Sequence, residues 1–253
     1  MGEHILVVGS GSPIATSSIS AFLARGDRVS TISRTSAPEE SDIQQPQTGA
    51  LRHFPCDLEN IKCIRNLLTK ISSNSLEIDR ICFFQRYRGE SLEPWGSEFS
   101  ISLLATAEII EWFAEVSSTK CERSVVIVTS PADSHIAGEQ PASYHAVKAG
   151  LSQLIRYYAV KFGKRGIRVN GVKPAIVIKP RSEDYYAKNP RLTGLFNRIT
   201  PLGRMGRPVD IANVILFLSS EGASFITGQI ISVDGGLSLH ESASLANIAA
   251  GDF

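Results

Sequence analysis

The chain has 253 residues, 43% of them hydrophobic, and a formal net charge of +1. It is long enough to bury one large core, and its near-neutral charge without long like-charge runs argues against nucleic acid or an anionic membrane surface as a partner. The four cysteines lack the spacing of a metal site or a disulfide framework, and no apolar run approaches the ~20 residues of a membrane span, so we expect a cytoplasmic protein without a metal.

Short β-branched runs alternate with longer helical patterns along the whole chain. Apolar strands separated by helices predict a parallel sheet that is covered on both faces and joined by right-handed crossovers. We therefore expect a single domain over 1–253, with a Rossmann-like, doubly wound α/β fold of about seven strands in three layers. The expected strands are 4–8, 28–33, 51–56, 80–84, 124–129, 167–173 and 229–233, and the expected helices are 14–25, 60–72, 98–116, 143–163, 183–197 and 209–219.

Three segments depart from this alternation. Residues 36–49 are polar and rich in turn formers, which predicts a surface loop. Residues 179–204 carry scattered proline, arginine and aromatic residues, which is typical of an insertion over one end of the sheet that serves as a substrate lid. The last residues, 239–253, form a weakly patterned tail.

A glycine-containing turn follows the first expected strand. Glycine lets the backbone turn tightly and approach a phosphate, and the N-terminus of the next helix offers free N–H groups. Proline suits the first position of that helix, because no hydrogen-bond donor is lost there. Many strand–helix turns contain glycine for steric reasons alone, but the position of this one in an alternating chain favours a dinucleotide site. The residues expected to bind the cofactor here are Gly9, Ser10, Gly11, Ser12 and Ile14.

The second expected strand ends at Ser33 and Arg34. NAD-binding sheets usually carry an acidic residue at this position, whereas a nearby arginine accommodates the 2′-phosphate of NADP. The pair therefore favours NADP(H) over NAD(H), although an arginine at a strand end can also be simply solvated. After the third strand, Asp57 and Leu58 are placed to contact the adenine; alternatively, Asp57 caps the next helix.

Tyr144 and Lys148 lie four residues apart in an expected helix, so they share one face. A cation beside a phenol favours the phenolate, and such a pair can transfer protons near neutral pH. Tyrosine and lysine at this spacing also occur on solvated helix faces. The pair becomes informative when it is taken together with the rest of the chain.

Together these residues resemble the short-chain dehydrogenase/reductase family over nearly the whole chain, as a divergent member. Ser130 precedes Tyr144 and Lys148 at about the spacing of that family. Three later segments resemble its sixth strand with a Pro-Gly turn, a late loop, and its last strand with the turn that follows: 168–175, 201–208 and 227–236.

The resemblance implies a role for each of these side chains. Tyr144 would be the general acid in ketone reduction or the base in alcohol oxidation. Lys148 would hold the nicotinamide ribose and stabilise the phenolate, and Ser130 would hydrogen-bond the reacting oxygen, on which charge develops during hydride transfer. The resemblance also implies a homotetramer or homodimer, with helix 143–163 and the last strand as interfaces. The further cofactor contacts that it implies are Pro174, Ala175 and Val177.

The chain departs from the family pattern at four places. The second and third glycines of the glycine motif are Pro13 and Ala15. The usual Asn-Asn-Ala-Gly segment is Phe83-Phe84-Gln85-Arg86, and Ser102 stands where the catalytic asparagine falls. The Pro-Gly turn has Ala175, with Lys179 at a position where threonine is common.

Arg86 and Arg88 are candidate substrate residues because guanidinium groups match carboxylates and phosphates; they could equally contact the cofactor phosphates or be solvated. Tyr185, in the expected lid, could line a substrate pocket or only pack. We expect an NADP(H)-dependent oxidoreductase that interconverts a carbonyl and a secondary alcohol on a small metabolite. Acidic metabolites are among the candidate substrates. The rival hypothesis is a degenerate family member with a non-redox role, such as ligand or nucleotide binding, isomerisation or elimination.

Overall fold

The computed structural model describes residues 2–34, 50–73, 76–89, 94–116 and 122–251, so the expected loop at 36–49 lies outside the described residues. Within them, seven strands form one parallel sheet in the order β3-β2-β1-β4-β5-β6-β7. This confirms the expected Rossmann-like α/β fold. The strands are β1 (His4–Val8), β2 (Arg28–Ser33), β3 (Leu51–Pro55), β4 (Arg80–Phe83), β5 (Arg123–Val128), β6 (Ile167–Pro174) and β7 (Ile230–Val233).

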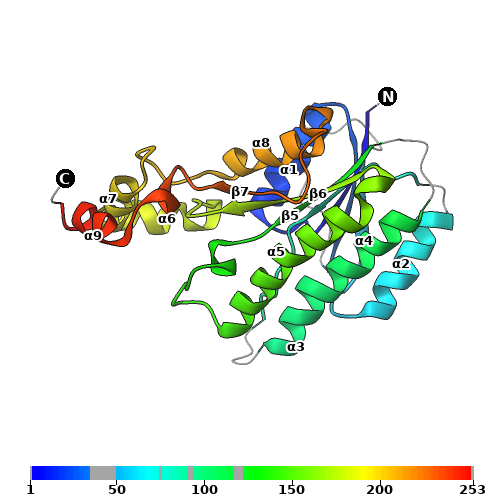
Figure 1. The fold of residues 1–253 in the computed structure, drawn as a ribbon, viewed down its shortest axis with the longest axis horizontal. Coiled ribbons are helices and arrows are strands. Elements are labelled where there is room, and N and C mark those ends of the chain that lie inside the picture. Colours follow the sequence, from blue (N-terminus) through cyan, green and yellow to red (C-terminus); the bar gives the residue numbers. More distant parts are fainter. Residues whose placement is uncertain (1, 35–49, 74–75, 90–93, 117–121, 252–253) are drawn as a thin grey trace.

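Helices cover both faces of the sheet (Figure 1). Alternating residues of β1 show why both faces are apolar: Leu6 and Val8 belong to one buried cluster, whereas Ile5 and Val7 belong to the other. On the Leu6 side the covering helices are α2 (Ile61–Ser73), α4 (Ala105–Glu115) and α5 (Ala142–Phe162), and on the Ile5 side they are α1 (Pro13–Ala24) and α8 (Pro208–Ser219). In the described part of the chain, no helix has both the length and the apolar character that crossing a membrane requires.

The order of the strands reverses between β1 and β4. From β1 the chain builds outward through β2 to β3, and then it returns to place β4 on the other side of β1. Val8 and Phe83, the last residues of the two central strands, are paired in register. In open parallel sheets this reversal leaves a crevice beyond the carboxyl ends of the strands, which is where ligands bind.

Two expectations about helices need correction. The helix expected at 98–116 begins with α3 (Trp95–Glu98), passes through a π-helical segment (Phe99–Leu104) and only then continues as α4. The helix expected at 183–197 begins earlier and is two helices, α6 (Pro180–Lys188) and α7 (Pro190–Ile199), because Pro190 has no N–H with which to continue the first.

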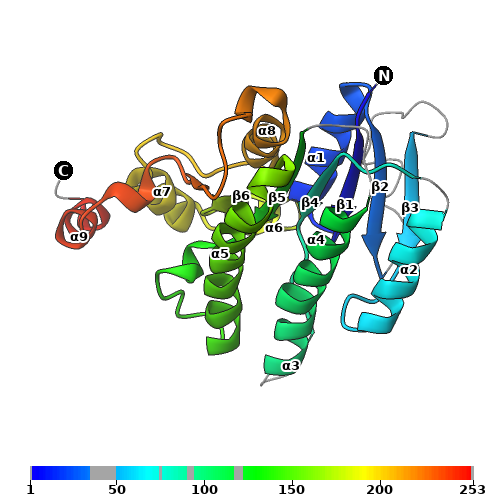
Figure 2. The ribbon, with the colours of Figure 1, turned by 45° about the vertical axis from the view of Figure 1, so that its right-hand side comes forward.

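The weakly patterned tail contains a further helix, α9 (Ser242–Ala250). Glu241 caps it, since its carboxylate accepts the backbone N–H groups of Ala243 and Ser244. The helix packs beside α7, beyond the β7 edge of the sheet (Figure 2). This tertiary contact stabilises a segment whose own amphipathic pattern is weak.

Candidate active site

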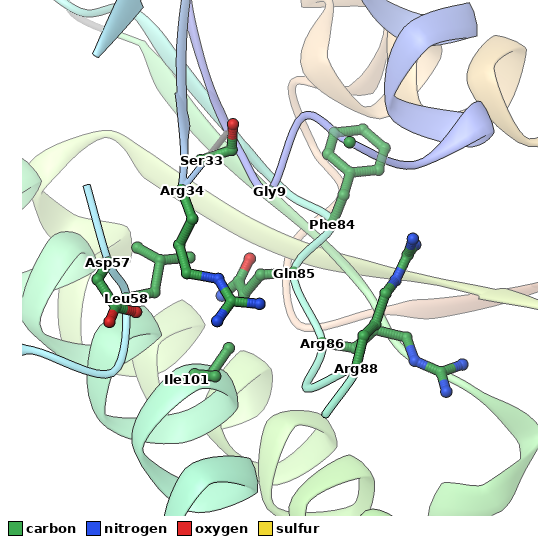
Figure 3. A pocket seen from close by; sticks show the side chains of 11 residues that line it. Gly9, Ser33, Arg34, Asp57, Leu58, Phe84, Gln85, Arg86, Arg88 and Ile101 are labelled. Atoms are coloured by element: carbon green, nitrogen blue, oxygen red, sulfur yellow. The ribbon is translucent and has the colours of Figure 1, made fainter. Parts of the chain in front are cut away.

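Two cavities open at the carboxyl ends of the strands, and they share three lining residues, Phe84, Arg86 and Arg88. We call them the β2 cavity and the β5 cavity after the strand that ends at each. The β2 cavity, shown in Figure 3, is lined by Gly9, Gly11, Ser33, Arg34, Asp57, Leu58, Phe84, Gln85, Arg86, Arg88 and Ile101. The other lining residues of the β5 cavity are Ser12, Pro13, Ile14, Val128, Thr129, Ser130, Tyr144, Lys148, Pro174, Ala175, Val177 and Lys179.

The turn after β1 has the geometry that a phosphate cradle needs. Gly9 has a φ of +83°, and a Cβ built there would lie 2.5 Å from the backbone nitrogen of Gln85. Only glycine fits this position. A Cβ on Gly11 would meet nothing within 4 Å, because this residue faces the open cavity.

Ser12 and Pro13 start helix α1 in a regular way. The Ser12 hydroxyl accepts the N–H of Ala15 at 3.1 Å, and Pro13 occupies the first helical turn, as the sequence predicted. The altered glycine motif is therefore compatible with a normal helix start beside the cavity. Ser10 is the exception among the expected cofactor residues here: its side chain is buried and it lines neither cavity.

At the far end of the β2 cavity, Ser33 and Arg34 are brought opposite Asp57 and Leu58 (Figure 3). The Arg34 side chain extends over the cavity from the end of β2. Asn60 caps α2, since its side-chain oxygen accepts the N–H groups of Lys62 and Cys63 at 3.1 and 3.2 Å. Asp57 is therefore not that cap; its Oδ1 accepts the N–H of Glu59 at 3.1 Å, and the residue lines the cavity wall.

Two cysteines meet behind this wall. The Sγ atoms of Cys56 and Cys63 lie 2.8 Å apart, a contact that the sequence spacing did not indicate. Burial and the neighbouring thiol raise the pKa of Cys56 to about 12, so this thiol stays protonated and is a poor nucleophile at neutral pH.

The β5 cavity gathers the three side chains that the sequence singled out for proton chemistry. Ser130 follows β5, and its Oγ accepts the N–H of Ala132 at 3.2 Å, while Tyr144 and Lys148 come from the first two turns of α5. Lys148 is 4% exposed, and its Nζ donates to the Val128 carbonyl at 3.2 Å and lies 5.6 Å from the centre of the Tyr144 ring. The four-residue spacing therefore places the phenol and the ammonium side by side at one cavity.

Lys148 has a strongly perturbed pKa. Burial lowers it to about 8, and the positive charge of Arg86 acts in the same direction, whereas Glu98 and Asp133 raise it. Asp133 lies just after Ser130 and is held by Lys173 at 2.6 Å. An ammonium that titrates this close to neutrality, inside a cavity, is a feature of functional sites.

The loop after β4 separates the two cavities. The guanidinium of Arg86 lies 5.3 Å from the centre of the Tyr144 ring, on the reaction side of the cleft. In Figure 3 the side chains of Arg86 and Arg88 both point away from Arg34. Because the two arginines line both cavities, the structure favours the two binding alternatives over a purely solvated role.

Glu98 is a residue of this site that the sequence reasoning missed. Its carboxylate is 4% exposed at the end of α3, and Ser102, in the asparagine position of the family, points its hydroxyl toward it at 3.5 Å. Burial raises the pKa of Glu98, although Arg86 and Lys148 act to lower it. No sequence signal marks this glutamate, because only the fold brings the end of α3 near Lys148. The π-helical segment that follows it is of a kind that is frequent at functional sites.

Tyr185 and His145 both lie outside the two cavities. Tyr185 is 55% exposed, stacks edge-on against Tyr186 and lines neither cavity, so the structure does not bring it to the site. His145 holds the loop before α5: its Nε2 accepts the N–H of Ala137 at 2.9 Å, and its Nδ1 lies 3.0 Å from the Pro141 carbonyl oxygen.

The protein has a Rossmann-like α/β fold. Its parallel sheet reverses its strand order between β1 and β4, and the two cavities lie at that reversal. A family model described as enoyl-(acyl carrier protein) reductase matches residues 9–238. The chain belongs to the short-chain dehydrogenase/reductase family of oxidoreductases.

Known relatives are similar over nearly their whole length. L-xylulose reductase from Bos taurus is 27% identical over 237 residues, which cover 93% of this chain and 96% of the relative. D-threitol dehydrogenase from Mycolicibacterium smegmatis is 26% identical over 249 residues, which cover 94% of this chain and 94% of the relative. A solved structure of 4-hydroxyisoleucine dehydrogenase complexed with NADH superposes with a TM-score of 0.83 at 25% identity, covering 94% of this chain and 100% of that one.

Proposed function

We propose that this protein is an NADP(H)-dependent oxidoreductase that interconverts a carbonyl and a secondary alcohol on a small metabolite. The observation that carries the proposal is that Ser130, Tyr144 and Lys148 line one cavity, which adjoins a second, glycine-lined cavity at the strand-order reversal. The family makes the chain an oxidoreductase of this general class; the cofactor preference and the catalytic roles are the proposed part.

The three side chains suit proton transfer at a carbonyl oxygen. In reduction, the Tyr144 hydroxyl donates a proton to that oxygen while Ser130 donates a hydrogen bond to it; in oxidation, Tyr144 accepts the proton from the alcohol. The ammonium of Lys148, beside the Tyr144 ring, stabilises the negative charge that appears on the phenol oxygen when it loses its proton. The bound nicotinamide supplies or accepts the hydride.

The β2 cavity fits the adenosine end of a dinucleotide. Gly9 and Gly11 leave room at the start of α1 for a phosphate, and Arg34 extends over the cavity from the end of β2, the strand end at which NAD-binding sheets carry an acidic residue. This supports NADP(H), since a guanidinium pairs with a 2′-phosphate. Relatives use either form, as the name L-rhamnose 1-dehydrogenase (NAD(P)(+)) of one from Sphingomonas indicates. The residues proposed to hold the nicotinamide half are Ser12, Ile14, Tyr144, Lys148, Pro174, Ala175 and Val177.

The relatives suggest the kind of substrate. L-xylulose reductase and D-threitol dehydrogenase act, by their names, on small polar sugars and polyols. A second structure of 4-hydroxyisoleucine dehydrogenase, a mutant that is 25% identical to this chain, holds NADH and succinate. We propose that segment 179–204, with helices α6 and α7, covers this substrate as a lid, and that Arg86 and Arg88 contact it.

We also propose that the protein acts as a homodimer or homotetramer. Helix α5 leaves two apolar side chains exposed, Tyr157 at 53% and Val160 at 85%, and such exposure of large apolar groups favours self-association. Size-exclusion chromatography with light scattering tests this: a monomer at micromolar concentration contradicts it.

Titration with NADPH and with NADH, followed by melting temperature, tests the proposed function. A ligand that binds only the folded state stabilises it by about 2.7 kcal/mol at a hundredfold excess over its Kd. We expect the larger shift with NADPH, and turnover of a small carbonyl substrate that Tyr144→Phe abolishes.

One observation favours the rival, non-redox function: the Arg86 guanidinium lies over the Tyr144 ring, where the family has a glycine. If neither cofactor shifts the melting temperature of the wild type or of Arg86→Gly, the redox proposal is wrong. If only Arg86→Gly responds, Arg86 closes the cofactor site in the natural protein, and the rival function is the better one.

A further inference from the structure

Three cationic side chains line the β5 cavity, and the charge of a fourth, Arg181, acts on two of them. Arg86 and Arg88 come from the loop after β4, and Lys179 and Arg181 come from the start of α6, far away in the sequence. Arg86, Arg88 and Lys179 line the cavity that also contains Tyr144. The cavity therefore has cationic side chains from two segments, the loop after β4 and the start of α6.

These cations repel one another. The pKa of Lys179 is lowered because the group is half-buried and because Arg86, Arg88 and Arg181 face it. The pKa of Arg88 is lowered by burial, and then by Arg86 and Arg181. Like charges brought together in a partly buried place destabilise the fold unless an anion joins them.

The protein provides little compensation of its own. Among the described residues, none of the four forms an ion pair, whereas other cations on the same surface do: Arg204 pairs with Asp210 at 2.7 Å. Glu98 attracts Arg86, but its carboxylate is buried below the loop and is also attracted to Lys148. The outer cations, Arg88, Lys179 and Arg181, are left without an anionic partner among the described residues.

The cofactor phosphates do not account for the whole of this cluster, although Arg86 and Arg88 also line the β2 cavity. The start of α1 and the glycine turn serve the pyrophosphate, and Arg34 is placed for a 2′-phosphate. Lys179 lines the β5 cavity but not the β2 cavity, so it faces the reacting groups rather than the adenosine end.

We propose, on the basis of the function proposed above, that the substrate carries a carboxylate or phosphate group that binds between the loop after β4 and the start of α6. Guanidinium groups hold such anions through paired, charge-assisted hydrogen bonds, and Lys179 adds a point charge. Bound there, the anion joins two segments that otherwise repel each other, which draws α6 over Tyr144 and orients the carbonyl toward the phenol. The succinate in a similar structure is an anion of this chemistry.

The test measures anion binding to the protein saturated with NADPH, and to the protein alone, by isothermal titration calorimetry with succinate and with inorganic phosphate. The double variant Lys179→Met/Arg181→Met removes two charges from the cluster. Its control, Lys62→Met/Lys70→Met, removes the same charge from exposed positions on α2, outside the proposed lid and both cavities.

We expect wild type and control to bind at least one anion, and the Lys179/Arg181 variant to bind it about tenfold or more weakly, as lost charge-assisted hydrogen bonds predict. Binding of succinate alone identifies a carboxylate substrate, and binding of phosphate alone a phosphorylated one. Arg88→Met should weaken the same anion if the double variant proves unstable.

Three results overturn the proposal: no binding of either anion with or without NADPH, equal weakening in the control, or loss of NADPH binding in the Lys179/Arg181 variant. The last result would mean that the cluster serves the cofactor. The proposed redox function fails separately, through the absence of any response to NADPH and NADH, so the two failures are distinguishable.

Discussion

The two sides of the β5 cavity differ in how closely they follow the family. On the β5 side, Ser130, Tyr144 and Lys148 have the family's residues and spacing, and Tyr144 and Lys148 are buried on a long helix that packs against the sheet. On the β4 side, the small polar segment of the family is replaced by phenylalanine, glutamine and exposed arginine. The groups proposed for proton transfer and those proposed for recognition thus lie on separate elements, so one set can change while the other is kept.

Tyr144→Phe should have the largest effect, because it removes the proposed proton donor and little else. General acid–base catalysis contributes roughly 10²–10⁴-fold, so kcat should fall by about that factor. Steady-state kinetics checks this, and NADPH binding should be retained. Activity within threefold of the wild type would mean that Tyr144 is not the proton donor, although the β5 side keeps the residues of the family.

The two glycines of the β1 turn should respond differently to alanine. Gly9→Ala forces a side chain into a left-handed φ and against the backbone of Gln85, which should lower the free energy of unfolding by roughly 1–3 kcal/mol. Gly11→Ala has open space, so stability should change by less than about 0.5 kcal/mol while NADPH binding weakens. Urea unfolding and cofactor titration measure both effects, and equal destabilisation would contradict the structure.

Arg34→Ala tests the adenosine end. Hydrogen bonds to charged groups contribute about 1.5–3 kcal/mol, so kcat/KM for NADPH should fall on the order of 10–100-fold while that for NADH stays nearly unchanged. Arg52→Ala is the control, since this exposed arginine on β3 lines neither cavity. An equal loss with both cofactors would remove the reason for preferring NADP(H).

The smallest expected effects concern the pH dependence of kcat. They test whether charges on the β4 side of the cavity act on Lys148 on the β5 side. The pKa of Lys148 is about 8, so its charge is complete below that pH and is lost above it, and kcat should decline along an alkaline limb there. Arg86→Leu removes a repelling cation, raises the pKa of Lys148 and moves the limb to higher pH. Glu98→Gln removes an attracting carboxylate and moves it to lower pH. If both variants shift the alkaline limb of kcat in the same direction, the charge of Arg86 does not control the pKa of Lys148.

The fold was predictable at the level of elements because its signals are local. Each expected strand is present, with ends that move by at most one residue, since a run of β-branched residues buried on both faces has few other conformations. The helix boundaries were less predictable. The π-helical segment before α4 and the capped helix α9 depend on contacts that a local pattern does not contain.

The site divides in the same way. Motif spacing was enough to single out Ser130, Tyr144, Lys148, the glycine turn and Arg34, because each has a recognisable residue type at a fixed offset from a strand or helix, and the fold brings each of them to one of the two cavities. Glu98, Lys179 and Arg181 lack such a signature. Folding places Glu98, at the end of α3, where its charge acts on Lys148, and it places the start of α6 where the charges of Lys179 and Arg181 act together with those of the loop after β4.

The order of residues along this chain thus specifies a parallel α/β sheet, its phosphate turn and its tyrosine–lysine pair, since all three follow from backbone preference and helical period. The cationic mouth of the β5 cavity and the opposing influences on Lys148 arise only when β4, α3, α5 and α6 are folded together. Electrostatic interactions depend on distance and burial in space, and neither quantity is encoded in separation along the sequence.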